Sequence, residues 1–540
     1  PFVQPELLPS LLELFVPHRC AKVVLFDSSI RGLSGISIKG ARMQAADNTS
    51  ILETKRLIFV SNRLPVSVHD GPDGLELKPS SGGLVTALRP ILHARQGYWV
   101  GWAGTENIQE FERLIAGSNY QDSRLVPVTL SERERKDFYC GFSNEIVWPL
   151  FHDLQSRCNF DPAYWRAYIS VNRKFAEAVA RVANNDSVIW VHDYHLMMLG
   201  SMLRKLGLRC KLAFFQHIPF PPADIFEKLP WRSEILRSLF EFDLLGFQTT
   251  RDQRNFAGCV RRLLPDTELQ RDAEHYLAHI GGRPVTIGSF PISIDFEEFS
   301  QQASLPGIAD RAAEIRRDAA GCQIVLGVDR LDYTKGIPER LKAFQNLLAT
   351  QERMHGKIIL VQIVVPSRED IQKYRELKQE IEQRISQING RFGSPAWVPV
   401  HYIHRHLERP ELLALYRAAD IALITPLKDG MNLVSKEFCA AQVKDEGVLI
   451  LSEFAGSADQ LRNGAILVNP YDTEAIAMAL QEAFAMNPKE RRDRMRRLRR
   501  KIKKENVFHW YTSFCADFDV PLSTNPDAAG TMAFKLAAPL

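Results

Sequence analysis

The chain has 540 residues, more than one hydrophobic core usually holds, and this length predicts roughly two or three domains. Its 45% hydrophobic and 24% charged residues are ordinary for a globular protein in water. A net charge of only +4 gives no indication of a nucleic-acid or membrane partner, and no apolar run approaches the roughly 20 residues that span a bilayer. Eight scattered cysteines without a CxxC pair predict reduced thiols and a cytoplasmic location.

From residue 56 onward, strand-like apolar runs alternate with helical patterns, including residues 164–183 and 225–242. This alternation predicts an α/β fold with parallel sheets and right-handed crossovers. Because the series occurs twice, we expect two doubly wound, Rossmann-like domains facing a central cleft. The predicted strands are residues 57–60, 98–101, 188–191, 212–215, 244–247, 286–290, 324–328, 358–365, 398–403, 421–424, 448–452 and 466–468.

The patterns also predict where the domains begin and end. We expect an N-terminal domain at residues 56–305 and a C-terminal domain at 306–520, whose last helix crosses back to the first domain. Residues 1–55 form an extension without a readable role, and residues 521–540 form a tail.

The run 489–504 is strongly basic and is the one hint of nucleic-acid binding. Its Met495, Leu498 and Ile502 share one helical face, which predicts an amphipathic helix with a solvated basic side. No aromatic residues are interleaved with the cations, so we predict no nucleic-acid partner.

Several cations and glycines follow predicted strands, where open α/β sheets bind ligands. Arg330 and Lys335 follow the strand at 324–328, and Gly336 permits a tight turn beside them. A guanidinium fork and an ammonium suit phosphate oxygens. Arg63 follows the first strand, and Gly83 precedes a helical pattern at 84–92. Each feature alone is compatible with a surface loop.

Asp193 and His217 each follow a buried-looking strand, which predicts a polar pocket. The sequence His-Asp-Tyr-His at 192–195 contains metal-ligand residue types, but it lacks the i, i+4 spacing of helical ligands and has no evident third partner. We therefore favour hydrogen bonds to sugar hydroxyls over a metal site.

The segment 425–437 predicts a strand end, a glycine turn and a helix start. Asp429 lies in the turn and Glu437 on the first turns of the helix, so both carboxylates can contact one elongated ligand. Main-chain N–H groups of Asn432, Leu433 and Val434 are placed for phosphate oxygens. Capping by Asp429 with a solvated Glu437 is the plain alternative.

Together these segments closely resemble the trehalose-6-phosphate synthases, which are retaining glycosyltransferases of the GT-B fold. The resemblance runs from about residue 56 to 518 and includes SNRLP, SGGL, GWAG, WVHDYHL, FFQHIPFPP, LLGFQT, GVDRLDYTKG, PSRED, INGRFG and TPLKDGMNLVSKEF. It implies transfer of glucose from a nucleotide sugar, usually UDP-glucose, to glucose 6-phosphate. Trehalose 6-phosphate would be the product.

The resemblance also implies residue roles. On the donor side, Arg330 and Lys335 would bind the diphosphate, Asp429 the sugar hydroxyls, Glu437 the ribose, Gly83 the phosphates through a mobile loop, and His217 the sugar. On the acceptor side, Arg63 and Arg368 would bind the phosphate, with Trp102, Tyr139, Trp148 and Asp193 around the sugar ring.

We expect no metal or other cofactor, because Arg330 and Lys335 can stabilise the departing diphosphate themselves. No DxDxT phosphatase motif follows, so a separate phosphatase would act on the product; a homo-oligomer is also expected.

Two alternative functions remain. A glucosylglycerol-phosphate synthase would use glycerol 3-phosphate, and residues 229–232 resemble such enzymes slightly. A regulatory protein would bind sugar phosphates without turnover.

Overall fold

The structure is a computed structural model that describes residues 55–518, except 72–73, 80–84, 86–87, 89–96, 117, 119, 121–123, 273 and 370. The predicted extension, the tail, Gly83 and most of the helical pattern at 84–92 therefore lie outside the described residues.

The first half of the described chain forms a sheet with the strand order β5-β4-β1-β6-β7-β8-β11-β10-β9. Neighbours from β5 to β11 run parallel, whereas β10 and β9 are antiparallel to theirs. The strands are β1 (Arg56–Arg63), β4 (Tyr98–Trp102), β5 (Arg124–Val128), β6 (Ser187–His192), β7 (Lys211–Phe215), β8 (Leu244–Phe247), β9 (Glu268–Asp272), β10 (His275–Ile280) and β11 (Arg283–Ser289).

Helical segments connect these strands, as parallel pairing requires. They are α2 (Ile108–Ala116), α3 (Glu132–Glu134), the π-helix η2 (Arg135–Val147), α4 (Trp148–Phe151), η3 (Gln155–Arg157), α5 (Pro162–Val182), η4 (Tyr194–Leu196), α6 (Leu199–Lys205), α7 (Ala223–Phe226), α8 (Arg232–Leu239) and α9 (Thr250–Leu263). A separate hairpin consists of β2 (Val66–Gly71) and β3 (Gly74–Pro79).

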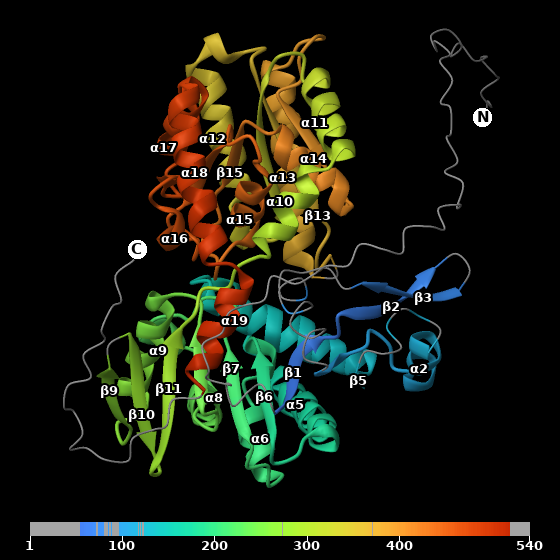
Figure 1. Cartoon of the computed structure of the whole chain (residues 1–540), viewed down its shortest axis with the longest axis vertical. Helices are drawn as coiled ribbons and strands as arrows, with labels where there is room; N and C mark the ends of the chain where they lie inside the picture. The colour runs from blue at the N-terminus through green and yellow to red at the C-terminus, as the bar shows by residue number, and fades with distance from the viewer. Residues whose placement is uncertain are drawn as a thin grey trace, which may run out of the picture. The chain divides into compact units, whose positions relative to one another are not determined.

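The second half forms a parallel sheet with the strand order β14-β13-β12-β15-β16-β17. In Figure 1 it lies between α17 on one side and α11 on the other. The strands are β12 (Gln323–Arg330), β13 (Ile358–Val365), β14 (Val400–Ile403), β15 (Ile421–Ile424), β16 (Val448–Ser452) and β17 (Ile466–Val468). The helical segments are α10 (Phe296–Ser304), α11 (Pro306–Asp318), η5 (Tyr333–Lys335), α12 (Ile337–Thr350), η6 (Glu352–Met354), α13 (Gln372–Phe392), α14 (Arg409–Ala418), α15 (Leu433–Ala441), α16 (Ala458–Leu461), α17 (Thr473–Ala485), α18 (Pro488–Lys504) and α19 (Val507–Ala516).

This architecture confirms the predicted α/β class with two parallel-rich sheets. The hairpin β2–β3 and the antiparallel pair β9–β10 were not predicted. A single helix over 225–242 is wrong: α7 ends at Phe226 and α8 starts at Arg232. Pro230 explains the break, since proline disfavours helical geometry in the residue before it.

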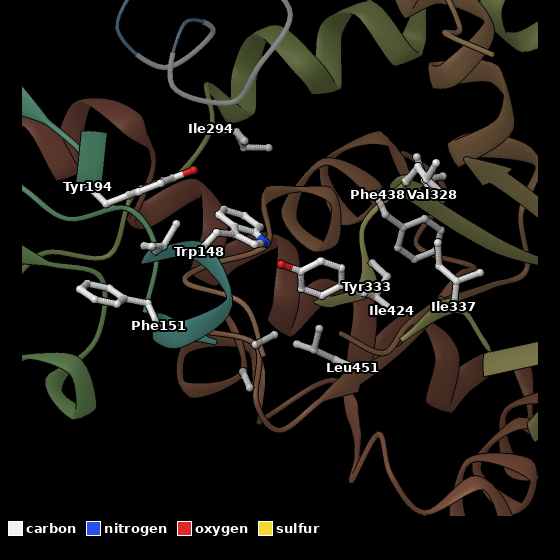
Figure 2. Close-up of a cluster of buried hydrophobic side chains, with 14 of the residues drawn as sticks. Trp148, Phe151, Tyr194, Ile294, Val328, Tyr333, Ile337, Ile424, Phe438 and Leu451 are labelled. Carbon is white, nitrogen blue, oxygen red and sulfur yellow. The ribbon is translucent and has the colours of Figure 1, made fainter. Parts of the chain in front are cut away.

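The hydrophobic core is continuous across both sheets. One cluster of buried side chains includes Trp148 and Tyr194 from the first half and Tyr333 and Phe438 from the second. Figure 2 shows these residues from both halves together. Tight packing of aromatic side chains at this junction limits how far the surrounding polar groups can shift.

The last helix, α19, packs against the first sheet although it follows the second in the chain (Figure 1). The ring of Phe514 stacks on Trp190 with the centroids 4.2 Å apart, and Trp510 lies 5.2 Å from the same indole. The domain boundaries near residues 305 and 520 stay predictions.

The basic run forms α18, and its Met495, Leu498 and Ile502 are buried as predicted. Several of its cations pair with acidic side chains of this chain, including Arg496 and Arg499 with Asp445. Among the described residues, no helix combines the length and apolar character needed to cross a membrane, and no disulfide joins the cysteines.

Candidate active site

Many of the predicted site residues lie where parallel strands end. Arg63, Trp102 and Arg330 are the last residues of β1, β4 and β12. Asp193 and His217 follow β6 and β7 within two residues. Arg330 is therefore the last residue of β12, whereas the sequence predicted it in the loop that follows this strand. Carboxyl ends of parallel strands are where such sheets bind ligands.

The predicted acceptor residues Arg63, Trp102 and Tyr139 are in contact. The Arg63 guanidinium lies 4.5 Å from the Trp102 ring centre and 5.6 Å from that of Tyr139. Burial favours the neutral Tyr139 phenol, but the charges of Arg368 and Arg63 outweigh it and hold the pKa of Tyr139 below its usual value. The buried indole N–H of Trp102 has no partner in the described part of the chain. A ligand oxygen could satisfy it.

Arg368 is buried in a network of its own. Its guanidinium pairs with Asp332 at 3.3 Å and donates hydrogen bonds to the Tyr374 hydroxyl at 2.7 Å and the Tyr194 hydroxyl at 3.5 Å. Burial opposes its charge, but the phenols of Tyr374 and Tyr194 and the carboxylate of Asp332 raise the pKa of Arg368 well above its usual value. Its Nε atom has no partner among the described residues.

Trp148 joins the two predicted phosphate sites. The Arg368 guanidinium lies 4.3 Å from its ring centre and that of Arg330 lies 5.9 Å away. The indole N–H donates to Asp332 at 3.3 Å, across the junction between the two halves. One aromatic side chain thus contacts a cation assigned to the acceptor and a cation assigned to the donor.

The predicted donor residues Lys335 and Asp429 form an ion pair at 2.6 Å, and the Asn432 amide donates to the same carboxylate at 3.2 Å. Burial of Asp429 opposes its ionisation, but Lys335 holds the pKa of this carboxyl below its usual value. Gly336 has φ 63°, and a Cβ there would lie 2.3 Å from the Thr425 carbonyl oxygen. Only glycine therefore fits this turn.

The other donor groups belong to the start of α15. Asn432 caps this helix by accepting from the Ser435 N–H, and Leu433 and Val434 are its first residues. Amides of a first turn lack intrahelical acceptors, so they can bind phosphate oxygens. Glu437 accepts a hydrogen bond from the Tyr416 hydroxyl at 3.0 Å. Burial raises the pKa of Glu437 above its usual value.

His217 connects the first half to the turn that contains Asp429 and Gly430. Its backbone N–H donates to Asp193 at 3.1 Å, and Asp193 has φ 75° and ψ 167°, a backbone region that residues other than glycine seldom adopt. Burial raises the pKa of Asp193 to about 6. A Cβ on Gly430 would lie 2.0 Å from the His217 carbonyl oxygen, so the two backbones are in close contact. Both ring nitrogens of His217 contact protein, as described below.

The site holds more cations than carboxylates that neutralise them. Arg368 and Lys335 have carboxylate partners, whereas Arg63 and Arg330 have none among the described residues. No group of three or more metal-ligating side chains occurs in the described part of the chain. Unpaired cations beside aromatic rings suit ligands that carry both phosphate and sugar.

Sequence reasoning missed several residues that shape this site, namely Asp332, Tyr194, Tyr374, Tyr416 and Gln248. Asp332 lies between Arg330 and Lys335 in the chain, so a carboxylate flanked by cations was an available signal. The three tyrosines gave none, because only tertiary packing brings their hydroxyls to Arg368 and Glu437.

Two Rossmann-like sheets whose strand ends supply one shared set of cations and aromatic rings have the architecture of the GT-B class of glycosyltransferases. The chain belongs to glycosyltransferase family 20, whose sequence model matches residues 55–519. A trehalose-6-phosphate synthase of Mycolicibacterium smegmatis is 42% identical over 472 residues, which cover 86% of this chain and 92% of the relative. One from Mycobacterium avium is 43% identical over 466 residues, which cover 85% of this chain and 94% of the relative.

Solved structures of trehalose-6-phosphate synthases are also similar to this chain. A structure from E. coli, bound with UDP-2-fluoro glucose, has a TM-score of 0.78 at 35% identity and covers 86% of this chain and 99% of its own. An alpha,alpha-trehalose-phosphate synthase (UDP-forming) from Burkholderia xenovorans, in complex with glucose-6-phosphate, has a TM-score of 0.77 at 33% identity with the same coverage.

Proposed function

We propose that the protein transfers glucose from a nucleotide sugar, UDP-glucose first among them, to glucose 6-phosphate with retention, giving trehalose 6-phosphate. The observation that carries this proposal is the contact of Trp148 with both Arg330 and Arg368. Two substrates that each carry phosphate need two cationic sites close to one sugar-binding surface. Membership of family 20 supports the same reaction.

The residues divide between the two substrates. Arg330 and Lys335 stabilise the diphosphate, whose charge grows as the glycosidic bond breaks, and a well-placed donor of this kind is worth about 3–4 kcal/mol. Arg63 and Arg368 hold the acceptor phosphate, while Trp102, Tyr139 and Trp148 cover its sugar ring. His217 and Asp429 contact the donor glucose, and Glu437 contacts the ribose.

We infer that the leaving phosphate itself accepts the proton of the attacking hydroxyl, on the same face of the sugar. The nearby carboxylates already have partners: Asp332 is bound by Arg368 and Trp148, Asp429 by Lys335, and Asp193 by the backbone N–H of His217. Such a reaction depends chiefly on placing the two substrates. We propose that it needs no metal; unchanged turnover in excess chelator would support this, and loss restored by a divalent cation would contradict it.

The product keeps the acceptor's phosphate, so we propose that a separate phosphatase releases free trehalose. A cytoplasmic location is proposed because the described cysteines form no disulfide. The homo-oligomer stays a prediction, which light scattering of the purified protein would test.

The deciding experiment follows nucleotide release by the purified protein with UDP-, ADP- or GDP-glucose as donor and glucose 6-phosphate or glycerol 3-phosphate as acceptor. Release that requires glucose 6-phosphate and yields trehalose 6-phosphate supports the proposal and identifies the base. Release with glycerol 3-phosphate alone would favour the glucosylglycerol-phosphate reaction. Donor binding without release would favour a regulatory protein.

A further inference from the structure

The chain crosses from the first sheet to the second after β11, and Ile292 in this crossing is held from both sides. Its N–H donates to the Gln248 side-chain oxygen at 3.0 Å, and its carbonyl accepts from Lys436 Nζ at 2.7 Å. Gln248 directly follows β8, and Lys436 lies on α15 next to Glu437. All three residues are buried. One linker residue therefore connects the first sheet to α15, the helix whose first turn is assigned to the donor.

These hydrogen bonds have a fixed direction. A backbone N–H can only donate, so the Gln248 atom facing Ile292 is the oxygen, and the amide nitrogen faces His217 Nδ1 at 3.3 Å. His217 Nδ1 must then accept. Burial lowers the pKa of His217 to about 3, so the ring is neutral and carries its proton on Nε2, 3.1 Å from His192 Nδ1. The linker backbone thereby selects the tautomer of His217.

Lys436 extends the connection to the place where the chain crosses back. It donates to Gln460 Oε1 at 2.7 Å, and Gln460 donates to Glu505 at 2.7 Å, at the end of α18. Two residues later, the Val507 N–H donates to the Ile294 carbonyl at 3.0 Å. An ammonium and a neutral amine both have enough N–H groups for the two bonds of Lys436.

We propose that Gln248 and Lys436 are positioning residues for glucosyl transfer: Gln248, oriented by the Ile292 N–H, fixes the tautomer and the placement of the His217 ring, and Lys436 holds Ile292 against α15. This inference rests on the proposed function, in which His217 contacts the donor sugar and α15 holds the nucleotide. Neither residue needs to touch substrate. Misplacement of reacting groups by about 1 Å can cost on the order of 100-fold in rate, so such a connection has a measurable consequence.

The test compares Gln248→Met, Lys436→Met and the double variant, because methionine keeps an unbranched chain but removes the hydrogen bonds. Matched controls are Gln301→Met and Lys444→Met, at exposed positions. Calorimetry measures the affinity for UDP and for UDP-glucose, and turnover gives kcat. In the proposed assignment the ribose contacts Glu437 of α15, whereas the glucose also contacts His217 of the first half. We expect unchanged UDP affinity, UDP-glucose affinity weakened about 10-fold and kcat lowered about 10- to 100-fold, with both controls like wild type.

The double variant decides whether the two residues act together. Because Lys436 reaches His217 only by way of Ile292 and Gln248, the double variant should be no worse than the more damaging single variant, whereas independent sites give effects that multiply. Multiplying effects would overturn the proposal, as would equal weakening of UDP and UDP-glucose. If Lys436→Met fails to fold, Gln248→Met alone must show unchanged affinity for UDP and weakened affinity for UDP-glucose. Failure of both variants to fold would also overturn the proposal. Should wild type bind UDP-glucose without forming trehalose 6-phosphate, the proposed function fails while the affinity split still tests the positioning.

Discussion

Lys335 donates to Asp429 at 2.6 Å, and both side chains are largely buried, with 12% and 14% of their surface exposed. A cation assigned to the donor diphosphate and a carboxylate assigned to the donor sugar therefore hold each other in place. Burial alone would raise the pKa of Asp429, and Lys335 more than offsets it. Lys335 thus has a second task beyond binding phosphate, which is to keep Asp429 ionised.

Replacing Lys335 with alanine should lower kcat about 100- to 1,000-fold, because one stabilising donor to the leaving group is lost. It should also raise the pKa of Asp429, since burial then loses its main opposing cause and only smaller ones such as the Asn432 hydrogen bond remain. Activity that requires ionised Asp429 would then be lost at a higher pH than in wild type. The kcat/KM for the donor, measured from acidic to neutral pH, shows both effects. Lys342→Ala, at an exposed position of α12, is the control, and an unmoved acidic limb would contradict this role.

Arg330→Ala should abolish most transfer while leaving the fold intact. The side chain is exposed and has no carboxylate partner in the described part of the chain, so its removal leaves no buried charge unpaired. We expect kcat to fall about 100- to 1,000-fold with an unchanged thermal unfolding midpoint. Arg353→Ala, at another exposed arginine, is the control. Normal turnover by Arg330→Ala would refute its assignment to the donor phosphates.

The two acceptor arginines should respond differently to removal. Arg63 contacts aromatic faces, so Arg63→Ala should raise the KM for glucose 6-phosphate far more than that for the donor, without loss of stability. Arg368→Ala should do the same, but it also leaves Asp332 buried without its cation. Breaking a buried pair in this way lowers the free energy of unfolding by about 3–5 kcal/mol.

Adding Asp332→Asn to Arg368→Ala separates these two effects. The added change removes the unpaired charge, so chemical denaturation should show recovered stability, while the KM for the acceptor stays high. If the KM values for donor and acceptor rise equally in the Arg63 and Arg368 variants, the acceptor-phosphate assignment is wrong.

The raised pKa of Asp193 predicts that the rate of transfer falls at acidic pH. Because burial raises the pKa of Asp193 to about 6, its carboxyl gains a proton as the pH falls through this value and no longer accepts hydrogen bonds from sugar hydroxyls as an anion. The kcat/KM for glucose 6-phosphate should therefore fall below about pH 6. A sugar phosphate also titrates near pH 6, so Asp193→Asn supplies the control. This variant should lose the part of the limb that belongs to Asp193; an unchanged profile would contradict the role.

Much of the fold followed from local patterns. Parallel strands buried on both faces are continuous apolar runs, so β6, β12 and β15 were recognisable before any packing was known. The antiparallel pair β9–β10 was missed because its side chains are partly exposed and lack such a run. The break before α8 could have been recognised from Pro230.

The candidate site was also partly readable. Arg330, Lys335, Asp429 and Glu437 occupy strand ends and turns where the chain itself limits their placement. The contacts of Glu437 with Tyr416 and of Arg330 with Trp148 were not readable, because these aromatic side chains come from distant elements. The assignments of all these residues to substrates stay predictions until the variants are measured.

The sequence by itself determined the α/β class, the two-sheet organisation and the ordered motifs of family 20, since hydrophobic periodicity and turn residues act over short stretches of chain. Only the tertiary structure decided which charges neutralise each other and which remain unpaired for phosphate. It also decided that Gln248, Ile292 and Lys436 meet. Hydrogen bonds and ion pairs depend on distances of a few ångströms between segments far apart in the chain, and folding alone sets those distances.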